Sequence, residues 1–307
     1  MKINKTALLL MLSCIFQLCH LAYEIMAINM KNLMFNDDKI YERTKNFLWT
    51  MERIRLDIEY DGTAYCGWQR QKDNVTIQQV IEEAIDKVQG GACVVEGSGR
   101  TDAGVHALNQ VAHFDSVCTI PQESWKFVLN NILPSDVRIK QSTGVQDNWH
   151  ARFWAKDKTY KYVFYNNRVN TAIKRNYSFF VPYRLDEEKM KFALLDLIGE
   201  HDFNAFMSRK SDKENTVRTV YSAYLKREGD ELHLYIKGNG FLHNMVRTIA
   251  GTLVDIGRGQ LPEDTFKRAI ETGDRVILGI TADAGGLFLC SVSYFDTLEE
   301  KIRAVGF

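Results

Sequence analysis

Proline is scarce in this chain, and no part of it is a low-complexity tract. Four prolines among 307 residues leave no Pro/Ser-rich stretch that would indicate a flexible linker between domains. Charge of one sign is also missing, because lysine plus arginine and aspartate plus glutamate number 39 each. Many nucleic-acid-binding proteins are basic overall, but a neutral protein can still concentrate positive charge in one cleft. The balance therefore argues weakly against a nucleic-acid-binding function and does not exclude it.

Cysteine is present, but nowhere in the spacing of a metal site. The six cysteines are scattered and form no CxxC pair: Cys14, Cys19, Cys66, Cys93, Cys118 and Cys290. This pattern predicts reduced thiols of an intracellular protein, with neither a zinc site nor a disulfide framework. With 45% hydrophobic and 25% charged residues, the composition is that of a soluble globular protein. The length allows two domains of ordinary size or one large one.

The first fifty residues differ from the rest. Lys2 and Lys5 precede an apolar stretch that runs from Ala7 to about Leu21, an order that resembles the charged and hydrophobic regions of a signal peptide. Polar residues interrupt the stretch, it is short for a membrane span, and no clean cleavage site follows it. We interpret residues 1–50 as an extra segment outside the fold, with Met51 as a candidate start. A genuine leader or anchor is the alternative.

Hydrophobic periodicity predicts strands and helices in alternation from Met51 onward. Residues 54–60 alternate apolar and polar side chains, as in a half-buried strand, and residues 75–88 show the three-four spacing of an amphipathic helix that ends before two glycines. The same patterns predict strands at 92–95, 110–114, 137–139, 159–165, 220–225, 231–236 and 286–292, and helices at 125–132, 186–197, 245–256 and 262–272.

The order of these elements is similar on either side of about residue 150. It favours an α+β fold of two ferredoxin-like, split βαβ halves with antiparallel sheets and an active-site cleft between them. We therefore predict an N-terminal domain at 51–149 that carries the catalytic loop, and a C-terminal domain at 150–307.

One loop carries the most informative chemical signal. Residues 99–107 read GRTDAGVHA and place a single carboxylate, Asp102, between Gly99 and Gly104. The glycines permit a tight loop and a close approach of the backbone, which suits a planar ligand that lies against the chain. On the residues alone, a polar turn in which Asp102 caps its own backbone is the simpler explanation.

This loop resembles the catalytic signature of the tRNA pseudouridine synthase A family. Other motifs resemble that family in the same order: EYDG at 59–62, GWQRQ at 67–71, HARF at 150–153, KTYKY at 158–162 and NGFLHNMVR at 239–247. The resemblance covers roughly residues 52–294, and residues 1 to about 50 have no counterpart. It implies an isomerase that converts uridine to pseudouridine at positions 38, 39 and 40 in the anticodon stem-loop of tRNA. It further implies a cytoplasmic homodimer with no membrane partner.

By this resemblance, three residues carry the reaction. Asp102 is the catalytic carboxylate, which attacks an electrophilic carbon or supports a glycal-like intermediate while the N1–C1′ bond breaks and C5 bonds to C1′. Arg247 is the partner that keeps this carboxylate ionised in a dry pocket. Tyr160 stacks under the flipped uracil, and such stacking is worth about 1–3 kcal/mol, comparable with the cost of unstacking the base. Without the resemblance, Arg247 is a surface arginine at a helix start and Tyr160 is a core aromatic.

Two further residues are implied to bind the substrate. Arg100 would displace the base or hold its phosphate, and Leu289 would line the pocket. The alternatives are a surface ion pair, worth under about 1 kcal/mol, and an ordinary core leucine. His106 and His243 are expected to support the loop and the helix start by hydrogen bonds. We expect no metal and no redox cofactor, because the reaction is a closed transfer and no metal-ligand cluster is present in the sequence.

Basic clusters at 156–161, 174–175 and 209–213 are candidate contacts for RNA phosphates, although each alone is more typical of a solvated surface. Two rival functions stay open. One is a synthase of the same fold that acts on another RNA, and the other is a non-catalytic RNA-binding module built on ferredoxin-like sheets. An ion pair between Asp102 and Arg247 would argue against the second, because a pure RNA-binding module has no use for it.

Overall fold

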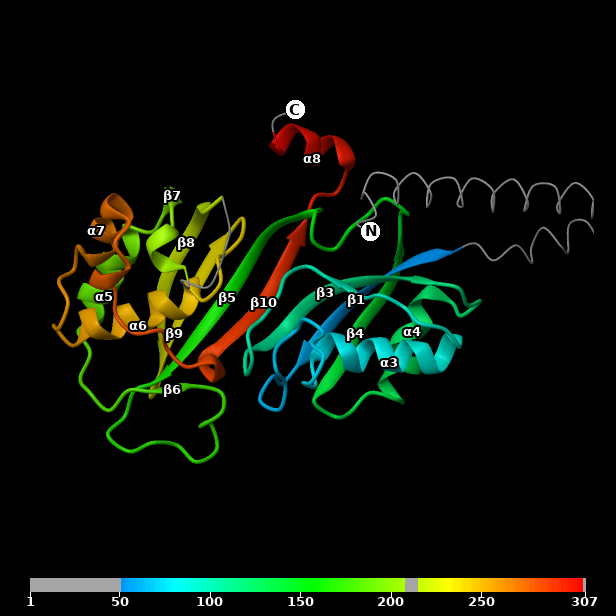
Figure 1. The fold of residues 1–307 in the computed structure, drawn as a ribbon. Coiled ribbons are helices and arrows are strands. Elements are labelled where there is room, and N and C mark those ends of the chain that lie inside the picture. The colour runs from blue at the N-terminus through cyan, green and yellow to red at the C-terminus, as the bar shows by residue number, and fades with distance from the viewer. Residues whose placement is uncertain (1–50, 208–214, 306–307) are drawn as a thin grey trace, which may run out of the picture. The chain divides into compact units, whose positions relative to one another are not determined.

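Ten strands form one sheet in the part of the chain that the structure, a computed structural model, describes: residues 51–207 and 215–305 (Figure 1). The strands are β1 (Glu52–Tyr60), β2 (Glu96–Gly97), β3 (His106–Ser116), β4 (Val137–Val145), β5 (Ala155–Tyr165), β6 (Phe179–Phe180), β7 (Gly199–Asp202), β8 (Val217–Glu228), β9 (Glu231–Gly238) and β10 (Leu287–Tyr294). Their order is β4-β1-β3-β10-β5-β9-β8-β7, with β2 paired to β3 and β6 paired to β5.

The two halves of the sheet order their strands alike. The first half runs β4-β1-β3 with β2 on the far side of β3, and the second runs β10-β5-β9-β8. The halves meet where β3 and β10 run parallel through only two register pairs, His106 with Phe288 and Ala107 with Leu289. The sequence predicted antiparallel sheets in separate halves, but this short parallel contact joins them into one. Periodicity along a strand reports which face is buried and carries no information about a distant partner strand.

Helices cover the apolar side chains of both halves. They are α3 (Ile77–Gln89), α4 (Trp125–Asn130), α5 (Glu187–Leu195), α6 (Met245–Gly257) and α7 (Thr265–Thr272), with short 3-10 turns at η1 (Gln122–Ser124), η2 (Asn204–Phe206), η3 (Arg275–Ile277) and η4 (Ala284–Gly286). The last helix, α8 (Leu298–Val305), follows β10, and its apolar residues Leu298 and Ile302 are exposed. The predicted α+β class is therefore confirmed. None of the helices in residues 51–207 and 215–305 is long and apolar enough to cross a membrane.

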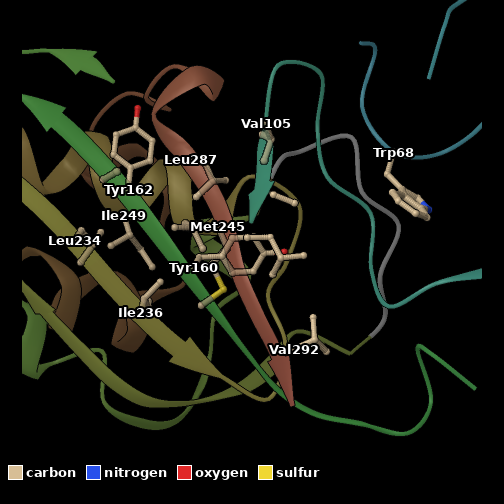
Figure 2. Close-up of a cluster of buried hydrophobic side chains, with 14 of the residues drawn as sticks. Trp68, Val105, Tyr160, Tyr162, Leu234, Ile236, Met245, Ile249, Leu287 and Val292 are labelled. Atoms are coloured by element: carbon tan, nitrogen blue, oxygen red, sulfur yellow. The ribbon is translucent and has the colours of Figure 1, made fainter. Parts of the chain in front are cut away.

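The amphipathic pattern of α3 explains its place in the core. Thr76 caps its start by accepting a hydrogen bond from the Gln79 amide, and Gly90 ends it in the left-handed conformation. Ile81 and Ile85 are fully buried, as the three-four spacing predicted. In the second half, α6 packs in the same way, and the buried side chains of β5 and β9 gather against Met245 and Ile249 (Figure 2).

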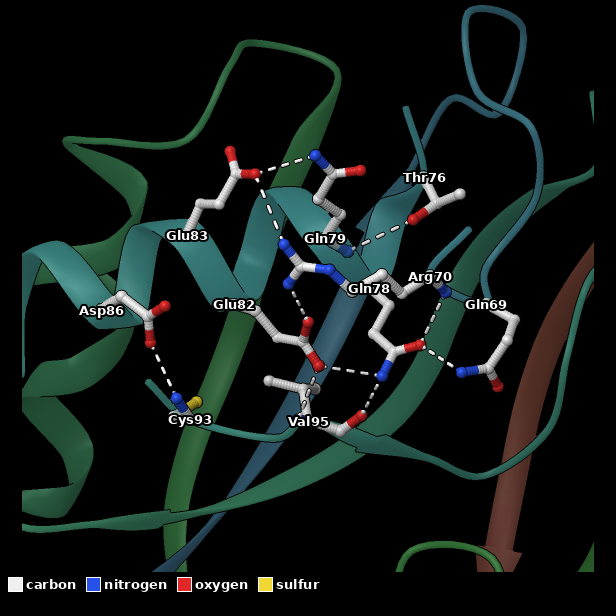
Figure 3. Close-up of polar contacts among 10 residues, drawn as sticks. All are labelled: Gln69, Arg70, Thr76, Gln78, Gln79, Glu82, Glu83, Asp86, Cys93 and Val95. Atoms are coloured by element: carbon white, nitrogen blue, oxygen red, sulfur yellow. Dashed lines mark hydrogen bonds and ion pairs between the residues drawn. The ribbon is translucent and has the colours of Figure 1, made fainter. Parts of the chain in front are cut away.

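The strand predicted at 92–95 is wrong. The only strand in this region is the two-residue β2, which begins at Glu96. The amide of Cys93 donates to the Asp86 carboxylate (2.8 Å) and the amide of Val95 donates to the Glu82 carboxylate (3.1 Å), as Figure 3 shows. Side chains of α3 thus take the main-chain donors that a strand would have used for pairing.

Residues 51–307 form one compact unit. The prediction that residues 1–50 are an extra segment lies outside the described residues.

Candidate active site

The loop between β2 and β3 that carries Asp102 is held by main-chain hydrogen bonds to the segment after β1. The amide of Trp68 donates to the carbonyl oxygen of Thr101 (3.1 Å), and the amide of Gly104 donates to that of Tyr65 (3.2 Å). Asp102 lies between these two contacts. Both sides of the loop are therefore fixed by backbone, which orients a side chain more rigidly than side-chain contacts do.

The close approach of the two segments depends on Gly67. Its φ is +85°, and a Cβ at this position would lie 2.5 Å from the Thr101 carbonyl oxygen and 3.1 Å from the Asp102 carbonyl carbon. Any other residue would be strained and would push the Asp102 loop away. The GWQRQ motif at 67–71 thus begins with a glycine because it packs on the loop with the carboxylate.

Lys158, on β5, links the start of the Asp102 loop to the second half of the sheet. Its Nζ donates a hydrogen bond to the carbonyl oxygen of Ser98 (2.7 Å). Gln110 adds a second anchor, because its amide nitrogen donates to the carbonyl oxygen of Gly99 (2.9 Å). Sequence reasoning missed this role of Lys158 and assigned the residue to a basic cluster for RNA.

That basic cluster does not act as one surface. Lys156 pairs with Glu300 (3.0 Å), and Lys161 lies over the ring of Phe288 (4.9 Å) on the opposite face of β5 from Lys158. Lys174 of the second cluster pairs with Glu231. The third cluster, at 209–213, lies outside the described residues.

The carboxylate of Asp102 meets two side chains of the NGFLHNMVR motif. Its Oδ2 lies 3.3 Å from Nη1 of Arg247, and its Oδ1 lies 3.2 Å from Nε2 of His243. The side chains of Asp102 and Arg247 are 26% and 18% exposed. The predicted pair thus exists, but it is partly exposed, not buried as expected. Both contacts are longer than the 2.7–2.9 Å typical of charge-assisted hydrogen bonds, and the exposed part of the Asp102 side chain leaves it accessible from solvent.

Arg247 is anchored on the side away from Asp102. Its Nε donates to the carbonyl oxygen of Ala282 (2.8 Å), and its Nη1 donates to Oδ1 of Asn244 (3.0 Å). Asn244 precedes α6 with a φ of 65°, the only non-glycine residue of positive φ in residues 51–207 and 215–305. Asparagine tolerates this conformation better than most residues. Local strain of this kind is frequent at functional sites.

His243 is the outer partner. Its side chain is 48% exposed, against 18% for Arg247. A ligand that approaches Asp102 from solvent can displace the histidine far more easily than the anchored arginine. Oδ1 is therefore the carboxylate oxygen that a ligand can reach once His243 moves away.

Tyr160 lies on β5 with only 8% of its surface exposed, and its ring meets Phe241 edge to face at 5.2 Å. Burial raises the pKa of Tyr160 well above its ordinary value, and the neighbouring Tyr60 and Asp102 raise it further. The phenol therefore stays protonated at neutral pH. Leu289, which is 1% exposed, lies directly across from Tyr160 on β10 and from Ala107 on β3.

Arg100 is exposed and turns toward the GWQRQ segment. Its Nε donates to Oε1 of Gln69 (3.0 Å), an amide oxygen, so the ion-pair alternative for this residue is not what the structure shows. Asp102 and Arg247 are in contact, Tyr160 is near enough to Asp102 for the carboxylate to affect its pKa, Leu289 lies across from Tyr160, and Arg100 is exposed in the same loop as Asp102.

His106 supports the loop from the start of β3. The amide of Gly62 donates to its Nδ1 (3.1 Å), and its Nε2 lies 3.0 Å from the carbonyl oxygen of Asn176. Oδ1 of Asp61 also lies 3.1 Å from Nδ1. A carbonyl oxygen can only accept, so Nε2 carries the hydrogen that is donated to Asn176. Both ring nitrogens are thus used for support, as expected from the sequence.

The Asp102 carboxylate lies between an arginine and a histidine from a segment more than 140 residues away, and near a buried tyrosine. This arrangement argues against a passive RNA-binding module, which has no use for such a pair. A family model described as tRNA pseudouridine synthase matches residues 58–154 and 193–295, which include Asp102, Arg247 and Leu289, while Tyr160 lies between the two ranges. The chain belongs to the tRNA pseudouridine synthase family.

Similar proteins from several bacteria agree with this family. The tRNA pseudouridine synthase A of Caldicellulosiruptor bescii is 46% identical over 244 residues, which cover 80% of this chain and all of that protein. The protein of the same name from Brevibacillus brevis is 44% identical over the same shares of both chains. That of Glaesserella parasuis is 43% identical over 79% of this chain and 92% of its own length. The resemblance inferred from the motifs is confirmed.

Proposed function

We propose that this enzyme isomerises uridine to pseudouridine at positions 38, 39 and 40 in the anticodon stem-loop of tRNA. The Asp102 carboxylate, faced by Arg247 and His243 and close to Tyr160, is the observation that carries the chemistry. The relatives' shared name, tRNA pseudouridine synthase A, supports tRNA as the substrate. A synthase that acts on another RNA is the alternative at the level of the substrate.

Asp102 is the catalytic residue of this proposal. The N1–C1′ bond of uridine breaks, the uracil turns over, and C5 bonds to C1′, while C5 loses its proton and N1 gains one. An ionised carboxylate serves either route, whether it attacks an electrophilic carbon of the nucleotide or supports a glycal-like intermediate. Arg247 holds Oδ2 and favours the ionised form, and displacement of His243 by the entering nucleotide presents Oδ1 to the reacting carbon.

Tyr160, Leu289 and Arg100 receive the flipped nucleotide. The ring of Tyr160 stacks on the uracil, and its protonated hydroxyl is available as a hydrogen-bond donor. Leu289 packs beside it across the strand contact and keeps the ring in place. Arg100, exposed at the rim of the loop, contacts a phosphate or the displaced base.

The RNA lies, in this proposal, in a cleft between two ferredoxin-like halves that divide near residue 150. The identical strand order of the halves supports this division, and the site draws Asp102 from the first half and Arg247 from the second. We further propose that the enzyme acts in the cytoplasm as a homodimer, as its family membership implies.

Replacement of Asp102 by Asn tests the proposal, because Asn keeps the size and most hydrogen bonds but removes the charge. We expect no detectable pseudouridine formation, with tRNA affinity within about tenfold of the wild type because phosphate contacts dominate RNA binding. Asp147→Asn, at an exposed loop position, is the matched control. Equal activity of Asp102→Asn would refute the catalytic assignment. Pseudouridine mapping in tRNA from a deletion strain tests positions 38–40 separately.

A further inference from the structure

Arg218, an arginine with no carboxylate partner among residues 51–207 and 215–305, lies beside the loop that leads from β9 to His243. Arg218 is the second residue of β8, and its Nη1 donates to the carbonyl oxygens of Asn215 (3.2 Å) and Val217 (2.5 Å). Within the described residues no acidic side chain pairs with it. Burial alone lowers the pKa of Arg218, with no opposing effect of a nearby carboxylate.

Three other arginines of the sheet have such partners, namely Arg53 with Asp115 (2.8 Å), Arg55 with Asp57 (2.8 Å) and Arg227 with Glu187 (2.6 Å). Within the described residues, Arg138 of β4 bonds only to carbonyl oxygens, as Arg218 does, but Arg218 is set apart by burial, which lowers its pKa. A partly buried cation without a counter-ion opposes folding. Such a cation indicates an anion that arrives with a ligand.

The free edge of the guanidinium has the geometry of a phosphate contact. Both described hydrogen bonds use Nη1, which leaves Nε and Nη2, the two donors that form a fork on one edge of the group. A Cβ on Gly240 would lie 3.7 Å from Nε. The glycine therefore leaves this edge uncovered where another side chain would lie against it.

Arg218 lies a short, fixed distance from the residues that contact Asp102. Gly240 and His243 are three residues apart, so their Cα atoms lie within about 11 Å of each other, and His243 contacts Asp102. Asn239 exchanges two hydrogen bonds with Thr219, the residue after Arg218, which fixes the loop to β8. An anion at Arg218 is thus held at a set distance from the carboxylate, within reach of a neighbouring nucleotide.

We infer that Arg218 binds a backbone phosphate of the tRNA next to the nucleotide at Asp102, an inference that rests on the proposed function. Its counter-ion is then part of the substrate. The alternative is a structural role, in which Arg218 only packs against Gly240 and thereby places Phe241 and His243.

The salt dependence of tRNA binding separates the two roles. Each neutralised phosphate adds about 0.7–0.9 to the slope of log affinity against log salt concentration. In the full-length chain, Arg218→Gln should lower the slope by about 1 and weaken binding about tenfold, while Arg218→Lys keeps the slope because it keeps the charge. The matched control is Arg138→Gln, since Arg138 is also the second residue of its strand and donates to the carbonyl oxygen of the preceding valine (2.8 Å). It should leave the slope unchanged.

An unchanged slope in Arg218→Gln would overturn the inference, whether or not turnover falls. If Arg218→Gln does not fold, the contact is tested by changing the RNA instead of the protein. Anticodon-arm RNAs with one neutral methylphosphonate linkage each are bound to the wild type and to Arg218→Lys. One linkage beside the target uridine should weaken binding by both proteins, because both carry the charge at position 218, and should weaken the wild type more, because only the arginine forms a bidentate contact. If no linkage weakens the wild type more than the lysine variant, the contact is refuted. Binding of unfractionated tRNA does not depend on which position is modified, so the slope test stands even if positions 38–40 are wrong.

Discussion

Replacement of Arg247 by Met removes three interactions at once and therefore tests how the site is assembled. The variant loses the contact with Asp102 and leaves two further acceptors without this donor, the carbonyl oxygen of Ala282 and Oδ1 of Asn244. Ala282 is fully buried. Leaving its carbonyl oxygen without a hydrogen bond lowers the free energy of unfolding by about 1–3 kcal/mol.

The ion pair itself contributes less than a buried pair would. The side chains of Asp102 and Arg247 are 26% and 18% exposed, so we count under about 1 kcal/mol for it, as for exposed pairs. The free energy of unfolding should therefore fall by about 2–4 kcal/mol, out of the 5–15 kcal/mol typical of a domain. Turnover should fall on the order of 10²–10³-fold, the effect of removing one oriented electrostatic partner.

Urea unfolding followed by circular dichroism gives the first quantity, and pseudouridine formation at saturating tRNA gives the second. Arg258→Met is the matched control. Arg258 is the residue directly after α6, forms an ion pair with Asp255 (3.7 Å) and stacks on the ring of Tyr183. It should lose stability but keep turnover. If Arg247→Met unfolds like the wild type and isomerises uridine at the same rate, Arg247 has no role in the site and the proposed assembly is wrong.

Three further predictions follow from the same structure. Tyr160→Phe keeps the ring, so tRNA affinity should stay unchanged while turnover falls; equal turnover would leave Tyr160 as a stacking residue only. Burial lowers the pKa of His113 from 6.5 to about 4. On acidification, the unfolded chain therefore takes up this proton at a higher pH than the folded chain does. The free energy of unfolding should have its full value above pH 6.5 and should fall by up to about 3 kcal/mol as the pH drops toward 4. His113→Asn should flatten this pH dependence in urea titrations, and an unchanged pH profile in the variant would contradict the prediction. Finally, a chain that begins at Met51 starts one residue before β1 and should be soluble and fully active on tRNA; loss of activity would show that residues 1–50 are required.

Local elements with a clear period were predictable from the sequence. The isoleucines of α3 repeat at helical spacing and are buried as expected, and the alternation in β1 predicted its buried face. The strand predicted at 92–95 failed because Glu82 and Asp86 of α3 take the main-chain donors of this segment. Such side-chain contacts leave no periodic signal.

The sequence by itself singled out candidate positions for the chemistry. The resemblance of the GRTDAGVHA loop to the family's signature made Asp102 a candidate, and the NGFLHNMVR and KTYKY motifs made Arg247 and Tyr160 candidates in the same way. Motifs of this kind are informative because each needs particular residue types at a fixed local spacing.

Only the tertiary structure decided how these positions meet. Asp102 and Arg247 are 145 residues apart, and they meet because the folded chain brings the loop between β2 and β3 next to the first turn of α6. The exposed fraction of the ion pair, the approach of His243 to Oδ1 and the lack of a carboxylate beside Arg218 among the described residues all depend on the tertiary arrangement. The physical reason is that hydrophobic periodicity specifies which face of an element is buried, whereas the partner that buries it is selected by the packing of the whole chain.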